Sequence, residues 1–327
     1  DNKFQVPATY YYAHISYIYE EYEISLKDFL TIKEDKTFGS IVSFYIAQLY
    51  YLQGNYDSVI VFAPKLLDTI NSKRAPEIAR IIGESYFHLK EYKKAIPYYK
   101  RYEKAYGVLP REDNYQLGYI YYKTGDCNSS LNYLAKVTES GIRDSLSQNA
   151  TYHMGDCYLK LNEKQKARNA FGKAANYNLD AVIEEDALFN YAKLNYELSY
   201  NPYNEAIRAF KKYTKRYPTS VRADEAYSYL VNAFVTTKNY KSALLYLEKI
   251  NDKTPELKAA YQKIAYYHGV YLFNNEQYET SIKLFKKSRT YNFDKTINAS
   301  SIYWEGEALY KLKPVSYTHL TLPTTRC

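Results

Sequence analysis

The chain has 327 residues, a net charge of +8 and 46% apolar residues, which is enough for one extended domain or two compact domains with a sizeable core. Tyr accounts for 43 residues, whereas only 11 are Gly and 10 are Pro, a composition that favours long helices with short turns over a loop-rich β protein. The positive charge is too small to indicate nucleic-acid binding by itself, and no apolar run is long enough to predict a membrane-spanning helix.

Pairs of small residues recur along the chain, and the two members of a pair usually lie twelve positions apart. In chain order the pairs are Ala13/Ser25, Ala47/Val59, Gly83/Ala95, Gly118/Ser130, Gly155/Ala167, Ala192/Ala206 (fourteen apart) and Gly269/Ser281, and Val231/Ala243 keeps the spacing with a larger first member. Their second members follow one another at intervals of 34 to 39 residues. Apolar residues surround each pair at spacings of three and four, as in an amphipathic helix. Because antiparallel helices cross closely only where side chains are small, each pair predicts one helix hairpin.

Turn signals separate the two helices of each predicted hairpin. Gly54 and Gly125 follow a first helix, where glycine readily adopts a positive φ. Pro64 and Pro97 fall within second helices and are expected to bend them. The aromatic residues that open second helices are Tyr22, Tyr56, Tyr92, Tyr203, Tyr240 and Tyr278. The large residues one turn beyond the second small residue are Phe29, Tyr99, Leu134, Phe171, Phe210, Leu247 and Phe285.

This combination of small, aromatic and large residues resembles the tetratricopeptide-repeat family from about residue 7 to Pro314. The resemblance implies an all-α fold, a right-handed superhelical solenoid of antiparallel helix pairs. We expect residues 1–314 to form about eight repeats and the first helix of a ninth, in a fragment of a longer protein. Residues 315–327 break the pattern and resemble translated sequencing-adapter sequence, so we treat them as a non-native tail.

The sequence shows no catalytic, phosphate-binding or metal-binding motif. The histidines of the predicted repeats and the cysteines are scattered: His14, His88, His153, His268, Cys127, Cys157 and Cys327. Three such cysteines form neither a disulfide framework nor a metal site. The acidic run at residues 184–186 is expected to open a helix, where the helix dipole favours negative charge. We therefore expect a non-catalytic protein without a cofactor or a bound metal.

In the tetratricopeptide-repeat family the first helices line a concave face that binds partners. By this resemblance the concave face is expected to carry Phe44, Tyr45, Gln48, Arg80, Glu84, Tyr115, Tyr119, Tyr152, Asp156, Phe189, Tyr229, Tyr266 and Tyr267. Tyr combines a large rigid surface with a polar tip, which suits protein recognition. We therefore predict a protein–protein interaction scaffold that binds a peptide or a partner domain. The alternative for each tyrosine is that it only fills a gap between neighbouring helices.

Two other functions stay open at this point. One is that the chain is the regulatory or substrate-recruiting arm of an enzyme whose catalytic domain lies outside the sequence. The other is that basic second helices, such as residues 93–104, contact anionic lipid or nucleic acid. The carboxylate clamp of some family members is not expected, because Glu84 would repel a carboxylate. A short likeness of residues 210–226 to bacterial cell-envelope repeat proteins favours the periplasm or the outer membrane as the location.

Overall fold

The computed structural model describes residues 4–68, 73–198 and 204–312. Tyr203, Cys327 and the predicted tail, residues 315–327, lie outside these ranges. The described residues form α-helices and one short 3-10 helix, and no strand occurs among them. This confirms the all-α class that the repeat pattern predicts.

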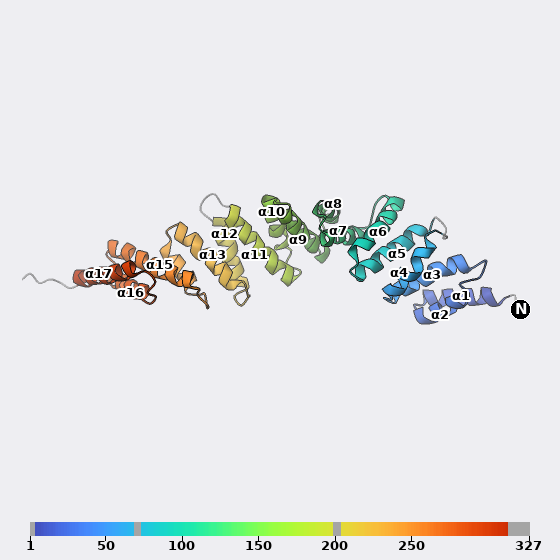
Figure 1. Ribbon diagram of the computed structural model, residues 1–327, viewed down its shortest axis with the longest axis horizontal. Helices are drawn as coiled ribbons and strands as arrows, with labels where there is room; N and C mark the ends of the chain where they lie inside the picture. Colours follow the sequence, from blue (N-terminus) through green and yellow to red (C-terminus); the bar gives the residue numbers. More distant parts are fainter. Residues whose placement is uncertain (1–3, 69–72, 199–203, 313–327) are drawn as a thin grey trace, which may run out of the picture. The chain divides into compact units, whose positions relative to one another are not determined.

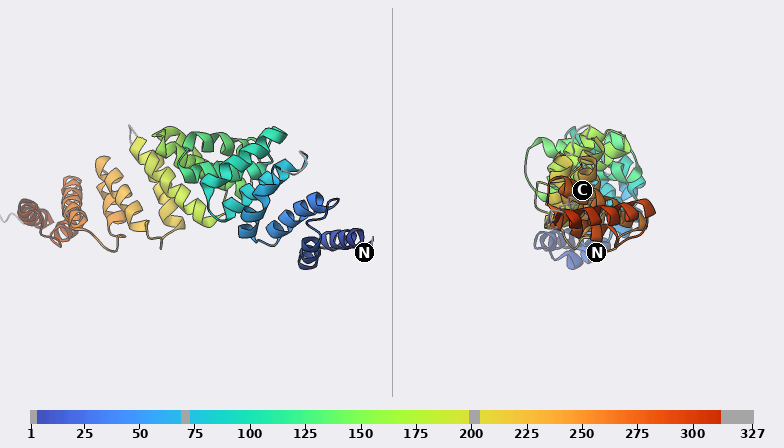
Figure 2. Two further views of the ribbon diagram at one scale, coloured as in Figure 1. Left: turned by 45° about the vertical axis from the view of Figure 1, so that its right-hand side comes forward. Right: turned by 90° about the vertical axis from the view of Figure 1, so that its left-hand side faces the viewer.

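The chain divides into two compact units, Asp1–Glu184 and Glu185–Cys327. The first unit contains α1 (Gln5–Ile18), α2 (Tyr22–Thr31), α3 (Gly39–Leu52), α4 (Tyr56–Phe62), η1 (Ala63–Leu66), α5 (Ala75–His88), α6 (Tyr92–Tyr106), α7 (Arg111–Thr124), α8 (Cys127–Glu139), α9 (Ser145–Lys160) and α10 (Lys164–Ala174). The boundary lies within α11 (Ala181–Leu198), and the second unit continues with α12 (Asn204–Arg216), α13 (Ala223–Thr236), α14 (Tyr240–Leu247), α15 (Pro255–Asn274), α16 (Tyr278–Ser288) and α17 (Lys295–Leu312). Within each unit, successive helices form pairs that follow one another in chain order, each against the next (Figure 1, Figure 2).

Each glycine of the small-residue pattern faces a large side chain on the second helix of its own pair. A Cβ added at Gly83 would lie 2.9 Å from the ring of Tyr99, and one at Gly155 would lie 2.9 Å from the ring of Phe171. The pairs Gly118/Leu134 and Gly269/Phe285 show the same contact at 2.8 Å. In all four pairs the large residue is fully buried. The first small residue of a pair therefore makes room for the large residue one turn beyond the second small residue.

The turn inside each described pair has the same backbone conformation. One residue adopts a positive φ, and the next N–H donates to a carbonyl five residues earlier, for example Asn55 to Tyr50 and Glu91 to Tyr86. Gly54 and Gly125 occupy this position as predicted. In the other described pairs the residue is not glycine: Glu20, Lys90, Asn162, Lys238 and Glu276. The repeated backbone geometry is thus kept even where the side chain disfavours it.

The two prolines predicted to bend second helices have different effects. α4 ends at Phe62, and the chain continues as the 3-10 helix η1, whose second residue is Pro64. Pro97 lies inside α6, which continues to Tyr106. Pro64 therefore shortens its α-helix, because a proline removes one backbone donor and crowds the preceding turn. α6 accommodates the same residue within a continuous helix.

We predict that Gly118→Ala lowers the free energy of unfolding. The added methyl carbon would lie 2.8 Å from Cγ of Leu134 and 3.2 Å from its backbone nitrogen, neither of which moves freely. Overpacking of this kind costs about 1–3 kcal/mol, which outweighs the gain of about 1 kcal/mol from a better helix former. Urea unfolding followed by circular dichroism measures the change.

Gly306→Ala is the matched control, because Gly306 lies within α17 and an added Cβ would meet no atom within 4 Å. Here the helix-propensity gain is unopposed, so the free energy of unfolding should rise by about 0.5–1 kcal/mol. Equal changes in the two variants would show that the Gly118–Leu134 contact does not limit the packing.

Candidate functional site

Three residues expected on the concave face lie on α3: Phe44, Tyr45 and Gln48. All three are half-buried. The ring of Tyr45 stacks on that of Phe29, with centroids 5.3 Å apart, and its hydroxyl lies 3.0 Å from Nε2 of His14. Tyr17 donates a hydrogen bond to the side-chain oxygen of Gln48 at 3.4 Å. These side chains largely fill the contact between the first two helix pairs.

Arg80 and Glu84 belong to a partly buried ionic cluster on α5, which Tyr51 of α3 joins. Nη2 of Arg80 donates to Glu77 at 2.6 Å, and Nη1 of Arg80 together with the hydroxyl of Tyr51 donates to Glu84. Glu84 is 3% exposed, which corrects the expectation that it lies on an open face. A buried carboxylate needs such partners, because removing one leaves an uncompensated charge. Charge reversal at Arg80 would therefore test stability rather than binding.

The predicted residues of the second unit also lie mostly within helix contacts. Phe189 is 4% exposed, with its ring against Phe210 and Tyr213 at centroid distances of 6.1 and 5.2 Å, so it belongs to the core and not to a binding face. Tyr229 stacks on Phe210 at 4.8 Å. The remaining two residues are on α15: Tyr266 is half-buried, and Tyr267 is 48% exposed.

Three of the predicted residues, Tyr115, Tyr119 and Tyr152, line one hollow of about 500 Å³ in the first unit. We call this hollow the aromatic pocket; its lining is Phe87, His88, Lys90, Tyr92, Tyr115, Tyr119, Asn149, Tyr152, His153 and Ile183. Its volume lies within the usual range for ligand sites. Asp156 is not part of this lining and accepts a hydrogen bond from Tyr122 at 2.8 Å.

Four first helices, one turn and the start of α6 bring this lining together. Tyr115 and Tyr119 are one turn apart on α7, and Tyr152 and His153 precede Gly155 on α9. The ring of Tyr119 meets Phe87, at the end of α5, at 6.0 Å, and meets the imidazole of His153 at 5.0 Å. The repeat register predicts the tyrosines. The contributions of Lys90 in the α5–α6 turn and of Tyr92 at the start of α6 follow only from the turn geometry.

His153 has an unusual environment inside the aromatic pocket. Its Nδ1 atom is buried, and no hydrogen-bond partner for it occurs among the described residues. Burial, together with the positive charges of Lys123 and Lys160, lowers the pKa of His153 to about 4. The imidazole is therefore neutral near pH 7 and presents an unsatisfied polar edge among aromatic rings.

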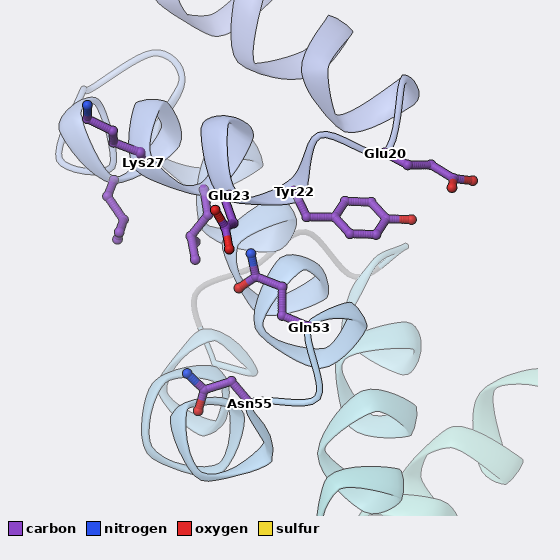
Figure 3. A pocket seen from close by; sticks show the side chains of 8 residues that line it. Glu20, Tyr22, Glu23, Lys27, Gln53 and Asn55 are labelled. Carbon is purple, nitrogen blue, oxygen red and sulfur yellow. The ribbon is translucent and has the colours of Figure 1, made fainter.

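A second hollow, of about 930 Å³, lies between α2 and the end of α3. Figure 3 shows Glu23 on α2 and Gln53 after α3 pointing toward each other, while Lys27 points away. Its other lining residues are Glu20, Tyr22, Leu26, Leu30 and Asn55. Only one side chain in the lining of this second hollow is aromatic, and the charged side chains in the lining are of both signs. The aromatic pocket therefore has the stronger recognition chemistry.

Some basic residues on or just after second helices pair with carboxylates of the same or a neighbouring element. Lys100 pairs with Glu103 at 2.9 Å, Lys287 pairs with Glu248 at 2.6 Å, and Arg289 pairs with Glu305. The helices thus carry a mixed surface rather than a uniformly positive one. Such pairs reduce the net positive charge that these helices present to a polyanion.

The described part of the chain contains no group of three metal-ligating side chains, and none of its helices is long and apolar enough to cross a bilayer. Cys127 and Cys157 are buried free thiols, and burial raises the pKa of Cys157 to about 12.

In the acidic run at residues 184–186, Glu185 accepts a hydrogen bond from the hydroxyl of Tyr213 at 2.9 Å, and Asp186 forms an ion pair with Arg222. These carboxylates lie near the start of α11, as expected, and they also contact residues of the next two helices or their caps.

Comparison with known proteins agrees with this architecture. Two tetratricopeptide-repeat family models match residues 115–181 and 186–220. A TPR repeat-containing protein of Methanocaldococcus jannaschii is 26% identical over 240 residues, and the match covers 70% of this chain and 41% of that protein's length. The C-terminal part of a TPR repeat-containing protein from Cytophaga hutchinsonii has a similar fold, with a TM-score of 0.53, 15% identity, and coverage of 76% of this chain and 97% of that one. Residues 115–181 and 186–220 are therefore tetratricopeptide repeats, and the other described helix pairs have the same helix-turn-helix form.

We predict that His153 makes stability depend on pH. Its pKa in the folded protein is below its ordinary value of 6.5, so the unfolded chain binds more protons between pH 6.5 and about 4. The free energy of unfolding should fall as pH drops through this window, by up to about 3 kcal/mol from this residue. Urea unfolding of the natural chain and of His153→Gln, at pH about 7 and about 4.5, measures it. Parallel pH dependence in the two proteins would contradict the assignment.

Proposed function

We propose that this chain is a non-catalytic protein-interaction scaffold that holds a peptide in the aromatic pocket. The observation that carries the proposal is the convergence of Phe87, Tyr92, Tyr115, Tyr119 and Tyr152 on one hollow of about 500 Å³. Large aromatic side chains dominate the energetics of protein interfaces, because they bury much area at a small entropic cost. The tetratricopeptide-repeat fold supports a role in protein interaction.

The pocket also carries polar groups that suit a peptide. Asn149 and His153 lie among the aromatic residues, and the Nδ1 edge of His153 lacks a partner among the described side chains. Apolar walls with a few convergent polar groups are typical of sites that bind a ligand in one orientation. A peptide supplies an apolar side chain for the walls and backbone amides for polar lining groups such as Asn149.

We predict that Tyr119→Ala weakens peptide binding by about tenfold or more, the scale of a truncated interface hot spot. Tyr119 contacts Phe87, Tyr92 and His153, so its removal opens the centre of the pocket. Peptides selected by the chain from a random-peptide display library serve as probes, and their affinities are measured by fluorescence anisotropy.

Two controls accompany this measurement. Tyr119→Phe keeps the ring and should bind with nearly natural affinity. Tyr106→Ala removes an exposed tyrosine at the end of α6, outside the pocket, and should also bind normally. Circular dichroism establishes that each variant is folded. Full-strength binding by folded Tyr119→Ala would refute the assignment of the pocket.

A further inference from the structure

The aromatic pocket opens at one side onto a cluster of lysines. A neighbouring hollow, also of about 500 Å³, shares Lys90 and Tyr92 with it. This hollow is further lined by Lys93, Lys94 and Lys123. All four lysines are exposed. Apolar and cationic surfaces therefore adjoin each other around the α5–α6 turn and the end of α7.

Most of this positive charge has no protein counter-charge. Lys94 forms an ion pair with Glu91, which is the carboxylate in the lining of that hollow. Within the described ranges no ion pair engages Lys90, Lys93 or Lys123. On other second helices, Lys100 and Lys287 each have a carboxylate partner. The rim of the aromatic pocket is thus a local excess of three positive charges.

Lys123 connects the two surfaces. Its ammonium group lies 5.2 Å from the ring centroid of Tyr119 and 5.8 Å from that of Tyr122. This position keeps the charge beside the pocket wall, where it also acts on His153. A negatively charged ligand group at this rim would be attracted to Lys123 without leaving the aromatic surface.

We propose, building on the peptide-binding function above, that the occupant is an acidic peptide. One large apolar side chain enters the aromatic pocket, and neighbouring Asp or Glu side chains lie over Lys90, Lys93 and Lys123. A basic segment would be repelled at the rim, and a neutral segment would gain no attraction from the three ammonium groups. Charge complementarity of this kind sets specificity and the rate of encounter more than total affinity.

The test compares peptides selected from one random-peptide library by three forms of the full chain. These are the natural chain, a rim variant (Lys90→Gln, Lys93→Gln, Lys123→Gln) and a matched control variant (Lys104→Gln, Lys173→Gln, Lys283→Gln). Both variants lose three positive charges, but the control lysines are exposed residues outside either hollow. A general attraction to a positive protein would therefore affect both variants equally.

We expect peptides selected by the natural chain and by the control variant to carry Asp or Glu next to a large apolar residue. The rim variant should lose this enrichment. A selected acidic peptide should bind the rim variant about tenfold more weakly, as three exposed ion pairs predict. A neutral version of that peptide, with Glu replaced by Gln and Asp by Asn, should bind the natural chain about as weakly as the acidic peptide binds the rim variant. Added salt should reduce the difference in affinity between the acidic and the neutral peptide for the natural chain.

The outcomes separate this inference from the proposed function. Selected peptides without acidic enrichment, whose binding still depends on Tyr119, would overturn the acidic specificity and keep the peptide-binding function. Selection that gives the same peptides with the natural chain and with Tyr119→Ala would overturn both. Displacement of the selected peptide by a single-stranded oligonucleotide that binds more tightly would assign the lysines and rings to nucleic acid instead.

Discussion

The contact between a glycine on a first helix and a large buried side chain on the second helix sets the geometry of this protein. Gly83 faces Tyr99, Gly118 faces Leu134, and Gly155 faces Phe171. A methyl group at any of these glycines would come within 2.9 Å of its neighbour. The two helices of a pair can therefore approach closely, and the large ring or branched side chain becomes the centre of the pair's core. The next pair then packs on a surface whose shape is already fixed.

The aromatic pocket follows from this regular packing. The turn inside each described pair has one residue with a positive φ, and the aromatic residue that opens the second helix can reach the next first helix. Tyr92 opens α6 and reaches Tyr119 on α7, with ring centroids 6.1 Å apart. Tyr240 reaches Tyr267 in the same way at 5.9 Å. A pocket arises where such rings leave a space, as they do between α5 and α9.

Charges in this protein have two different roles that depend on burial. Glu84 and Arg80 are tied together on α5, so their charges support packing. Lys90, Lys93 and Lys123 are exposed, and an acidic ligand can neutralise them without disturbing the core. Since buried pairs are costly to break and exposed charges are cheap to leave hydrated, only the exposed set suits reversible recognition.

The sequence by itself determined the all-α class, the positions of the helix pairs and the turns at Gly54 and Gly125, because these depend on spacing and on local backbone preference. It also placed Tyr115, Tyr119 and Tyr152 on the first helices that form the aromatic pocket. Only the tertiary structure decided that Glu84 and Phe189 are buried, and that Lys90, Tyr92 and His153 join those tyrosines. It likewise showed the buried amide of Gln148 binding the backbone of Asp180, 32 residues away. The physical reason is that periodicity within one helix identifies its apolar face, whereas the side chains that fill the space opposite come from a neighbouring pair.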